Sequence, residues 1–167
     1  MRSLAALAAA SLLLAGCGLR PLYSGGSGGR VAQSLAGVSV QPIPGRAGWL
    51  VRNALTDRLA AAGSSEARYR LEVELDDQIT GFGVRSDNAV TRERRMLRAR
   101  YRLVDAAAGT VVVDATAGSD AGIDVVSSEY ATIAAEESAL ERLSAEIADQ
   151  ILVRLALYAA RTSPAAP

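Results

Sequence analysis

The most regular pattern in the chain is a strict alternation of apolar and polar residues that begins at residue 68 and extends to about residue 83. One face carries Tyr69, Leu71, Val73 and Leu75, and the other carries Arg70, Glu72, Glu74 and Asp76. Alternation with a period of two is typical of a strand with one buried face and one wet face. We therefore predict a strand over residues 68–83, with a bulge or twist at Gly81-Phe82-Gly83.

A second alternating run follows a polar turn at residues 85–88 and covers residues 89–104. Its apolar face carries Leu97, Ala99, Tyr101 and Leu103, and its other face carries Arg92, Arg94, Met96, Arg98, Arg100 and Arg102. A turn at residues 106–109 leads into a valine-rich run from residue 110 to 117, which continues less regularly toward residue 126. Three consecutive strands predict an antiparallel meander.

Two segments show helical spacing instead. Over residues 47–62, apolar residues recur at Val51, Leu55, Leu59 and Ala62, and Gly63 follows at a helix C-cap position. From residue 129 to 160, a longer apolar stripe consists of Ile133, Leu140, Leu143, Ile147, Ile151, Leu155 and Tyr158. We interpret this stripe as core, because a sheet with one apolar face needs helices to cover it.

A short alternating run over residues 37–43, closed by Pro42 and Pro44, predicts one more strand near a sheet edge. The order strand, helix, three strands, helix predicts an α+β fold. We expect a two-layer sandwich in which two helices pack on one face of a mostly antiparallel four-stranded sheet. This single domain covers residues 37–160, and residues 161–167 are predicted to be a disordered tail.

The N-terminal segment has the features of a secretory signal. Arg2 precedes an apolar run over residues 4–15, which ends in Leu14-Ala15-Gly16-Cys17. This pattern resembles the bacterial lipobox, which implies a signal peptide over residues 1–16 and an acylated Cys17 as the first mature residue. The glycine-rich residues 17–36 then predict a flexible tether. The residue after the cysteine is Gly18, which favours the outer membrane.

The composition argues against most enzyme classes. The chain has no histidine and a single cysteine, Cys17, so it lacks the usual zinc ligand sets, a second cysteine for a disulfide and a Ser-His-Asp triad. Asp76 and Asp77 are candidates for carboxylate chemistry, but neighbouring residues of a strand point to opposite faces. We therefore expect no catalytic activity, no cofactor and no metal.

The net charge is zero, with 18 basic and 18 acidic residues, yet the two signs are separated along the chain. Five arginines share one face of the strand over residues 89–104, spread over roughly 34 Å. Phosphates and carboxylates are natural partners of such a row. At an outer membrane the available anion is lipopolysaccharide, and nucleic acid is not expected.

A structural interpretation of this row is also open. If the two long strands pair through the turn, Arg102, Arg100 and Arg98 oppose Glu72, Glu74 and Asp76, which suits cross-strand ion pairs. At the end near the turn, Arg92 and Arg94 face Phe82 and Thr80, with Arg95 close by, and a ligand role and a solvated surface remain equally open there.

Together these residues resemble the alphaproteobacterial form of the LPS-assembly lipoprotein LptE family. The resemblance covers nearly the whole chain. It rests on the lipobox followed by Gly18-Leu19-Arg20-Pro21-Leu22-Tyr23, the arginine strand, Tyr101-Arg102-Leu103-Val104-Asp105, Ser128-Glu129-Tyr130-Ala131 and the acidic last helix. The chain departs from relatives in having no lysine.

This resemblance implies a lipid-anchored protein at the periplasmic face of the outer membrane. Such a protein plugs the LptD barrel, helps it to assemble, and binds lipopolysaccharide during its export. The candidate lipopolysaccharide-binding residues are Arg92, Arg94, Arg95, Arg98 and Arg100. Of these, Arg98 and Arg100 are the weaker candidates because acids lie nearby. An auxiliary lipoprotein of a phospholipid-transport system, of the ABC or Mce type, is the alternative.

Overall fold

The computed structural model describes residues 30–63, 65–84 and 90–162. Seven elements follow one another along these residues. In chain order they are α2 (Arg30–Ala36), β1 (Val38–Val40), α3 (Gly45–Ala60), β2 (Tyr69–Val84), β3 (Val90–Asp105), β4 (Val111–Asp124) and α4 (Glu129–Thr162).

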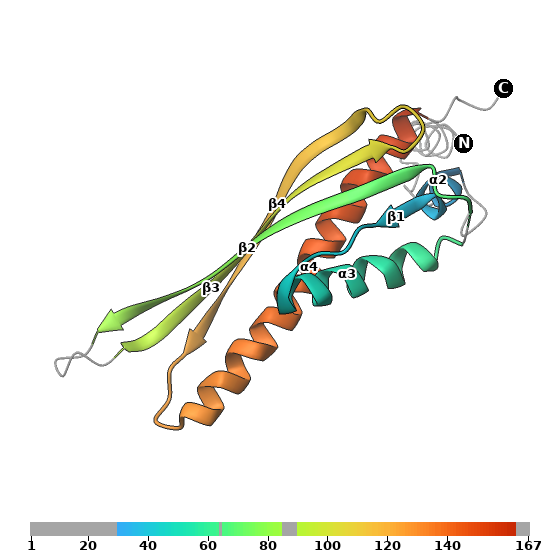
Figure 1. Cartoon of the computed structure of the whole chain (residues 1–167). Coiled ribbons are helices and arrows are strands. Elements are labelled where there is room, and N and C mark those ends of the chain that lie inside the picture. The colour runs from blue at the N-terminus through green and yellow to red at the C-terminus, as the bar shows by residue number, and fades with distance from the viewer. Residues whose placement is uncertain (1–29, 64, 85–89, 163–167) are drawn as a thin grey trace, which may run out of the picture.

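The four strands form one sheet in the order β1-β2-β3-β4 (Figure 1). The long strands β2, β3 and β4 are antiparallel neighbours, as the meander predicts, and β1 pairs in parallel with the first three residues of β2. Glu72, Glu74 and Asp76 lie opposite Arg102, Arg100 and Arg98. The predicted register of the β2–β3 hairpin is therefore confirmed.

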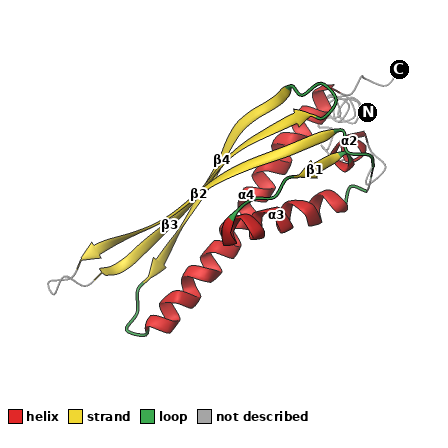
Figure 2. Cartoon of the chain, viewed as in Figure 1, coloured by secondary structure: helices red, strands yellow, loops and turns green. Residues whose placement is uncertain are grey.

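Helices α3 and α4 cover one face of the sheet and leave the other face uncovered within the described residues (Figure 2). The predicted α+β sandwich is confirmed, with three helices instead of two. The additional helix, α2, packs against α4 and α3. It occupies the last seven residues of the segment that the sequence analysis assigned to the tether, where no helix was predicted.

The length of α4 matches the length of the sheet. A helix of 34 residues is about 51 Å long, and a strand of 16 residues is about 53 Å long. One helix can therefore follow β4 along its length, while the far ends of β2 and β3 extend away from it, as Figure 1 shows. This explains how a domain with few aromatic residues still forms an extended core.

The core lies where the apolar face of the sheet meets the stripe of α4. Leu71, Leu97 and Leu103 of the sheet are almost completely buried, and so are Leu140, Leu143, Ile147, Ile151 and Leu155 of α4. Buried alanines, among them Ala99, Ala117, Ala148 and Ala156, let the helix approach the strands closely. The stripe predicted from the sequence is core from Leu140 onward.

The predicted stripe is wrong at its first member, because Ile133 is 50% exposed. In this turn of α4 the buried residue is Thr132. Its hydroxyl accepts a hydrogen bond from the Val126 backbone N–H at 3.4 Å. A residue one position further along a helix is rotated by about 100°, since 3.6 residues make a turn. Ile133 therefore points away from the core.

The linker from β1 to α3 is short and tightly packed. Pro42 and Pro44 have no backbone N–H, so the chain cannot continue β1 as a sheet strand beyond Gln41. At Gly48 an added Cβ would lie 2.5 Å from the backbone oxygen of Ile43. Only glycine allows α3 to pack this closely on the linker.

The burial pattern of α4 gives a stability prediction. Replacing Ile147 with alanine should lower the free energy of unfolding by about 2–5 kcal/mol, because it leaves a cavity in the core. The same change at Ile133 should cost less than about 1 kcal/mol, because this side chain is half exposed. Urea unfolding followed by circular dichroism measures both. Equal losses at the two positions would contradict the burial of the stripe.

Candidate functional site

The alternation of β3 places its arginines on the face of the sheet opposite the helices. Leu97, Ala99, Tyr101 and Leu103 point to the core, so residues with even numbers point away from it. We call the outward surface that is formed by Arg92, Arg94, Arg98, Arg100 and Arg102 the arginine face. Its first four arginines are exposed, and Arg102 is partly buried.

Three of these arginines pair with acids of β4. Arg92 lies 3.0 Å from Asp124, Arg94 lies 3.6 Å from Asp120, and Arg100 lies 3.0 Å from Asp114. The sequence analysis considered only β2 as the neighbour of the arginine strand. Since β3 is a central strand, it has acids on both sides, and the end near the turn also carries the acids Asp120 and Asp124.

The pairs predicted with β2 form only in part. Arg102 contacts Glu72 at 3.5 Å and Glu74 at 3.3 Å, as expected. Arg98 lies opposite Asp76 in the register but forms no ion pair with a described residue. Its hydrogen bond goes to the Met96 sulfur at 3.8 Å.

The other neighbour of Arg98 is Gly118 of β4, which has no side chain. A Cβ at this position would lie 3.0 Å from an Arg98 guanidinium nitrogen. The glycine therefore leaves room for the guanidinium to lie across β4. Arg98 was ranked below Arg92 from the sequence, yet it is the arginine of this face that lacks an ion-pair partner among the described residues.

The ion pairs of the arginine face are exposed and therefore weak. The side chains of Arg92 and Asp124 are 63% and 74% exposed, and the other two pairs with β4 are similar. Exposed pairs typically contribute about 0–1 kcal/mol, because water solvates both partners well. An incoming phosphate could replace these carboxylates at little cost. Arg94 also lies over the Phe82 ring, 5.8 Å from its centroid.

Arg95 does not belong to the arginine face. It lies on the helix side of β3 and is 9% exposed. Its Nε and one terminal nitrogen donate to the two Asp77 oxygens at 2.9 and 2.6 Å, and the other donates to the Glu136 backbone oxygen at 2.9 Å. Its hydrogen bond to Asp77 raises the pKa of the Arg95 guanidinium. Arg95 thus joins β2, β3 and α4.

Sequence reasoning grouped Arg95 with Arg92 and Arg94 by proximity and missed this role. The signal was available in the alternation, because residue 95 has the same parity as Leu97 and residue 77 the same parity as Leu75. Close to this pair, partial burial and the neighbouring Glu136 carboxylate raise the pKa of Glu93. The charges on the helix side of the hairpin are therefore organised around α4, separately from the arginine face.

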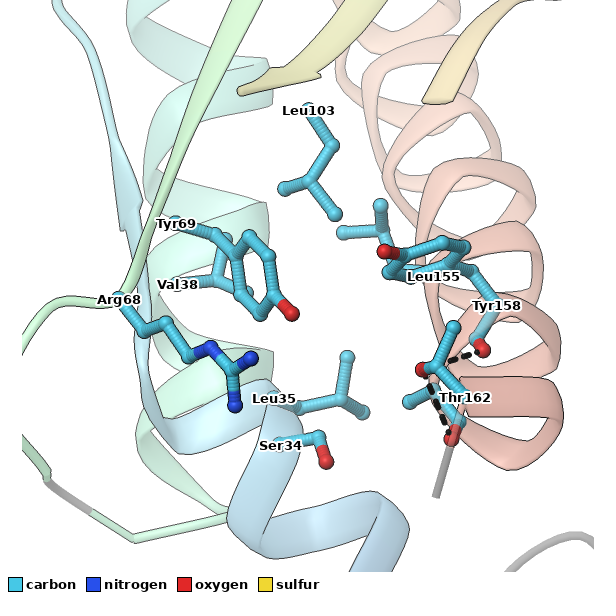
Figure 3. Close-up of a pocket in the computed structure, with 10 residues that line it drawn as sticks. Ser34, Leu35, Val38, Arg68, Tyr69, Leu103, Leu155, Tyr158 and Thr162 are labelled. Carbon is cyan, nitrogen blue, oxygen red and sulfur yellow. Dashed lines mark hydrogen bonds between the residues drawn. The ribbon is translucent and has the colours of Figure 1, made fainter. Parts of the chain in front are cut away.

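A pocket lies at the opposite end of the domain, between α2, the start of β2 and the end of α4 (Figure 3). Its volume is about 150 Å³, and apolar walls from Leu35, Val38, Leu103 and Leu155 face one another across it. Tyr69 and Tyr158 meet edge to face with ring centroids 6.2 Å apart. Burial raises the pKa of the Tyr158 hydroxyl.

The comparison with protein families matches residues 35–155 to the LptE family, described as lipopolysaccharide-assembly. The chain belongs to the LptE family. Membership connects the chain with lipopolysaccharide assembly and favours a non-enzymatic role. It does not favour the phospholipid-transport alternative.

Solved structures agree with LptE membership. A Caulobacter crescentus protein described as a lipoprotein is 34% identical, with a TM-score of 0.64 over 81% of this chain and 98% of that one. The minor lipoprotein of Acinetobacter baumannii is 16% identical, with a TM-score of 0.60 over 78% and 96%. Rare lipoprotein B of Shewanella oneidensis is 13% identical, with a TM-score of 0.59 over 74% and 95%. The last two show the fold alone. No match was found among curated proteins.

Within the described ranges, no helix of this LptE family member is long and apolar enough to cross a membrane. The same residues hold no group of three or more acids that could bind a metal ion. The predicted signal peptide and lipidated Cys17 lie outside the described residues.

The position of Arg95 gives a prediction that separates structural from surface arginines. Replacing Arg95 with glutamine should lower the free energy of unfolding by about 2 kcal/mol or more, because it leaves a half-buried Asp77 and the Glu136 carbonyl without their donor. The control is Arg100→Gln, which breaks an exposed pair and should cost at most about 1 kcal/mol. Thermal and urea unfolding measure both, and equal costs would contradict the distinction.

Proposed function

We propose that this LptE family protein is anchored through an acylated Cys17 to the periplasmic face of the outer membrane, where it plugs the LptD barrel. It helps the barrel to assemble and binds lipopolysaccharide during export. Family membership is the observation that carries this proposal. The lipobox at Leu14-Ala15-Gly16-Cys17 supports the anchor.

The arginine face supports the lipopolysaccharide part of the proposal. A guanidinium presents a planar fork of donors that suits the phosphates of lipid A and the carboxylates of the inner core. We propose Arg92, Arg94, Arg98 and Arg100 as the contacts. Arg92, Arg94 and Arg100 would each exchange a weak ion pair with an acid of β4 for a contact with lipopolysaccharide. Arg98 has no ion pair with a described residue to give up.

Arg95 takes a different part in this proposal. Its guanidinium is held by Asp77 and by the Glu136 carbonyl on the helix side of the sheet. We propose that it acts as a positioning residue that holds the hairpin against α4, and that it does not contact lipopolysaccharide itself.

Recovery of a barrel partner tests the first part of the proposal. The full chain, expressed with its lipobox in an alphaproteobacterium, should copurify from detergent-solubilised membranes with a large outer-membrane barrel that mass spectrometry identifies as LptD. The Cys17→Ser variant should lose its acyl mass and leave the outer-membrane fraction. Recovery of inner-membrane transporter components instead would overturn the proposal in favour of phospholipid transport.

Lipopolysaccharide binding tests the arginine face. The double variant Arg94→Gln, Arg98→Gln should bind purified lipopolysaccharide at least about tenfold more weakly, since one charged hydrogen bond contributes about 1.5–3 kcal/mol and 1.4 kcal/mol is a factor of ten. Its Tm should change by less than about 3 °C, because at most one weak, exposed ion pair is lost.

The matched control is the double variant Arg52→Gln, Arg142→Gln. These two arginines are exposed on α3 and α4, so the control removes the same charge from the helix layer. Its affinity should stay within about threefold of the unmodified chain. Equal weakening in both variants would mean that total charge, and not the arginine face, determines binding.

A further inference from the structure

Among the described residues, the edge of the sheet at β2 has no neighbouring strand over most of its length. β1 pairs with β2 only from Tyr69 to Leu71, and the Gln41 N–H adds one bond to the Leu71 oxygen. Pro42 and Pro44 then turn the chain away toward α3. β2 continues to Val84, so its second half projects beyond β1, as Figure 1 shows.

The orientation of Leu71 identifies the backbone groups that face this edge. Because its oxygen points toward β1, every second residue after it repeats that direction. The N–H and C=O groups of Asp77, Ile79 and Gly81 therefore point outward. These three residues are exposed, and no described residue donates to or accepts from their backbone groups on that side. We call the stretch of β2 over residues 77–81 the open edge.

The opposite edge of the sheet is capped by α4 at one position. The Gln150 side chain accepts a hydrogen bond from the Gly118 N–H at 3.2 Å and donates one to the Gly118 oxygen at 3.1 Å. One amide side chain thus satisfies both outward groups of β4 at this position, as a neighbouring strand would. Over residues 77–81, no described side chain caps β2 in this way.

The open edge also has few of the charges that usually prevent strand addition, because its one charged residue, Asp77, is held by Arg95. Residues 78–82 carry no charged side chain. Ile79 is 44% exposed on the helix side, and Phe82 is 40% exposed on the arginine side. Just before this stretch, Asp76 accepts the Gln78 side-chain amide and forms no ion pair with a described residue. A strand that pairs here would therefore need apolar side chains beside Ile79 and Phe82 and a basic side chain beside Asp76.

We propose that the open edge binds an extended segment of the barrel partner, which adds to the sheet as a fifth strand beside β2. The segment places an apolar side chain next to Ile79 and a basic side chain next to Asp76. Five residues of strand span about 17 Å, an ordinary strand length. This inference rests on the proposed function, which supplies the barrel, and adds the surface and the mode of contact.

The chemistry favours a polypeptide as the occupant. Alternating N–H and C=O groups along a strand edge are matched by another backbone, and the flanking side-chain positions provide specificity. The carboxylate of Asp76, for which no described residue provides an ion pair, favours a basic segment. A second copy of this chain would bring the same acids to the shared edge and is the competing outcome of the test.

Hydrogen exchange of the full chain, alone and bound to the purified barrel in detergent, tests this inference. The amides of Ile79 and Gly81 should exchange quickly in the free chain and at least about tenfold more slowly in the complex. The amides of Gln78 and Thr80 point to β3, so they should be protected in both states. Protection of Ile79 that depends only on the concentration of the free chain would assign the edge to a second copy.

Backbone variants provide the matched comparison. Ile79→Pro removes one outward N–H and no bond to β3, so it should weaken barrel binding at least tenfold while the Tm changes little. Ile79→Thr keeps the N–H and should bind within about threefold. Thr80→Pro removes a hydrogen bond to β3 and should lower the Tm strongly. Such a drop would confirm that the Thr80 N–H points to β3 and the Ile79 N–H to the open edge.

The outcomes separate the two proposals. If no barrel complex forms with the unmodified chain, the proposed function fails and this inference fails with it. If the complex forms but Ile79 and Gly81 remain unprotected, or Ile79→Pro binds normally, only the strand addition is overturned.

Discussion

The period-two alternation of β3 is the constraint on which the rest of the structure depends. As a central strand, β3 places each side chain either against α4 or on the open face, and a shift by one residue would exchange these sets. Leu97, Ala99 and Tyr101 can be buried only if Arg98 and Arg100 are outside. The core and the arginine face are therefore two consequences of one register, and neither can be changed without the other.

The same constraint explains how much the sequence could predict. Both alternating strands, both amphipathic helices and the β2–β3 register were predictable because the patterns are long and the turn between them is short. The pairing of β4 was not, since a register irregularity between Leu103 and Val104, just before the apolar turn, shifts which acids face β3. Asp114, Asp120 and Asp124 could thus be assigned to Arg100, Arg94 and Arg92 only from the structure.

Two further features were not predicted correctly from the sequence: helix α2 and the role of Arg95. The seven-residue helix α2 follows a glycine-rich segment and is too short to show a reliable period. Arg95 was misread because proximity in sequence was given more weight than parity. A single arginine on the apolar side of a strand indicates a buried partner, which is Asp77 on the neighbouring strand. Parity along a strand is therefore stronger evidence for the role of a charged residue than its distance along the chain.

The position of α4 accounts for the asymmetry between the two sheet edges. The helix follows β3 and β4 and supplies Gln150 to the outer edge of β4. The shorter helix α3 begins near the middle of the sheet and runs back toward β1, so it does not reach the far half of β2 (Figure 2). Unprotected strand edges favour aggregation, and globular proteins usually block them with charges, prolines or bulges. The open edge, whose one charged residue is held by Arg95, therefore lies beside the arginine face, and the two surfaces meet at Phe82 and Arg94, where one bound molecule would contact both.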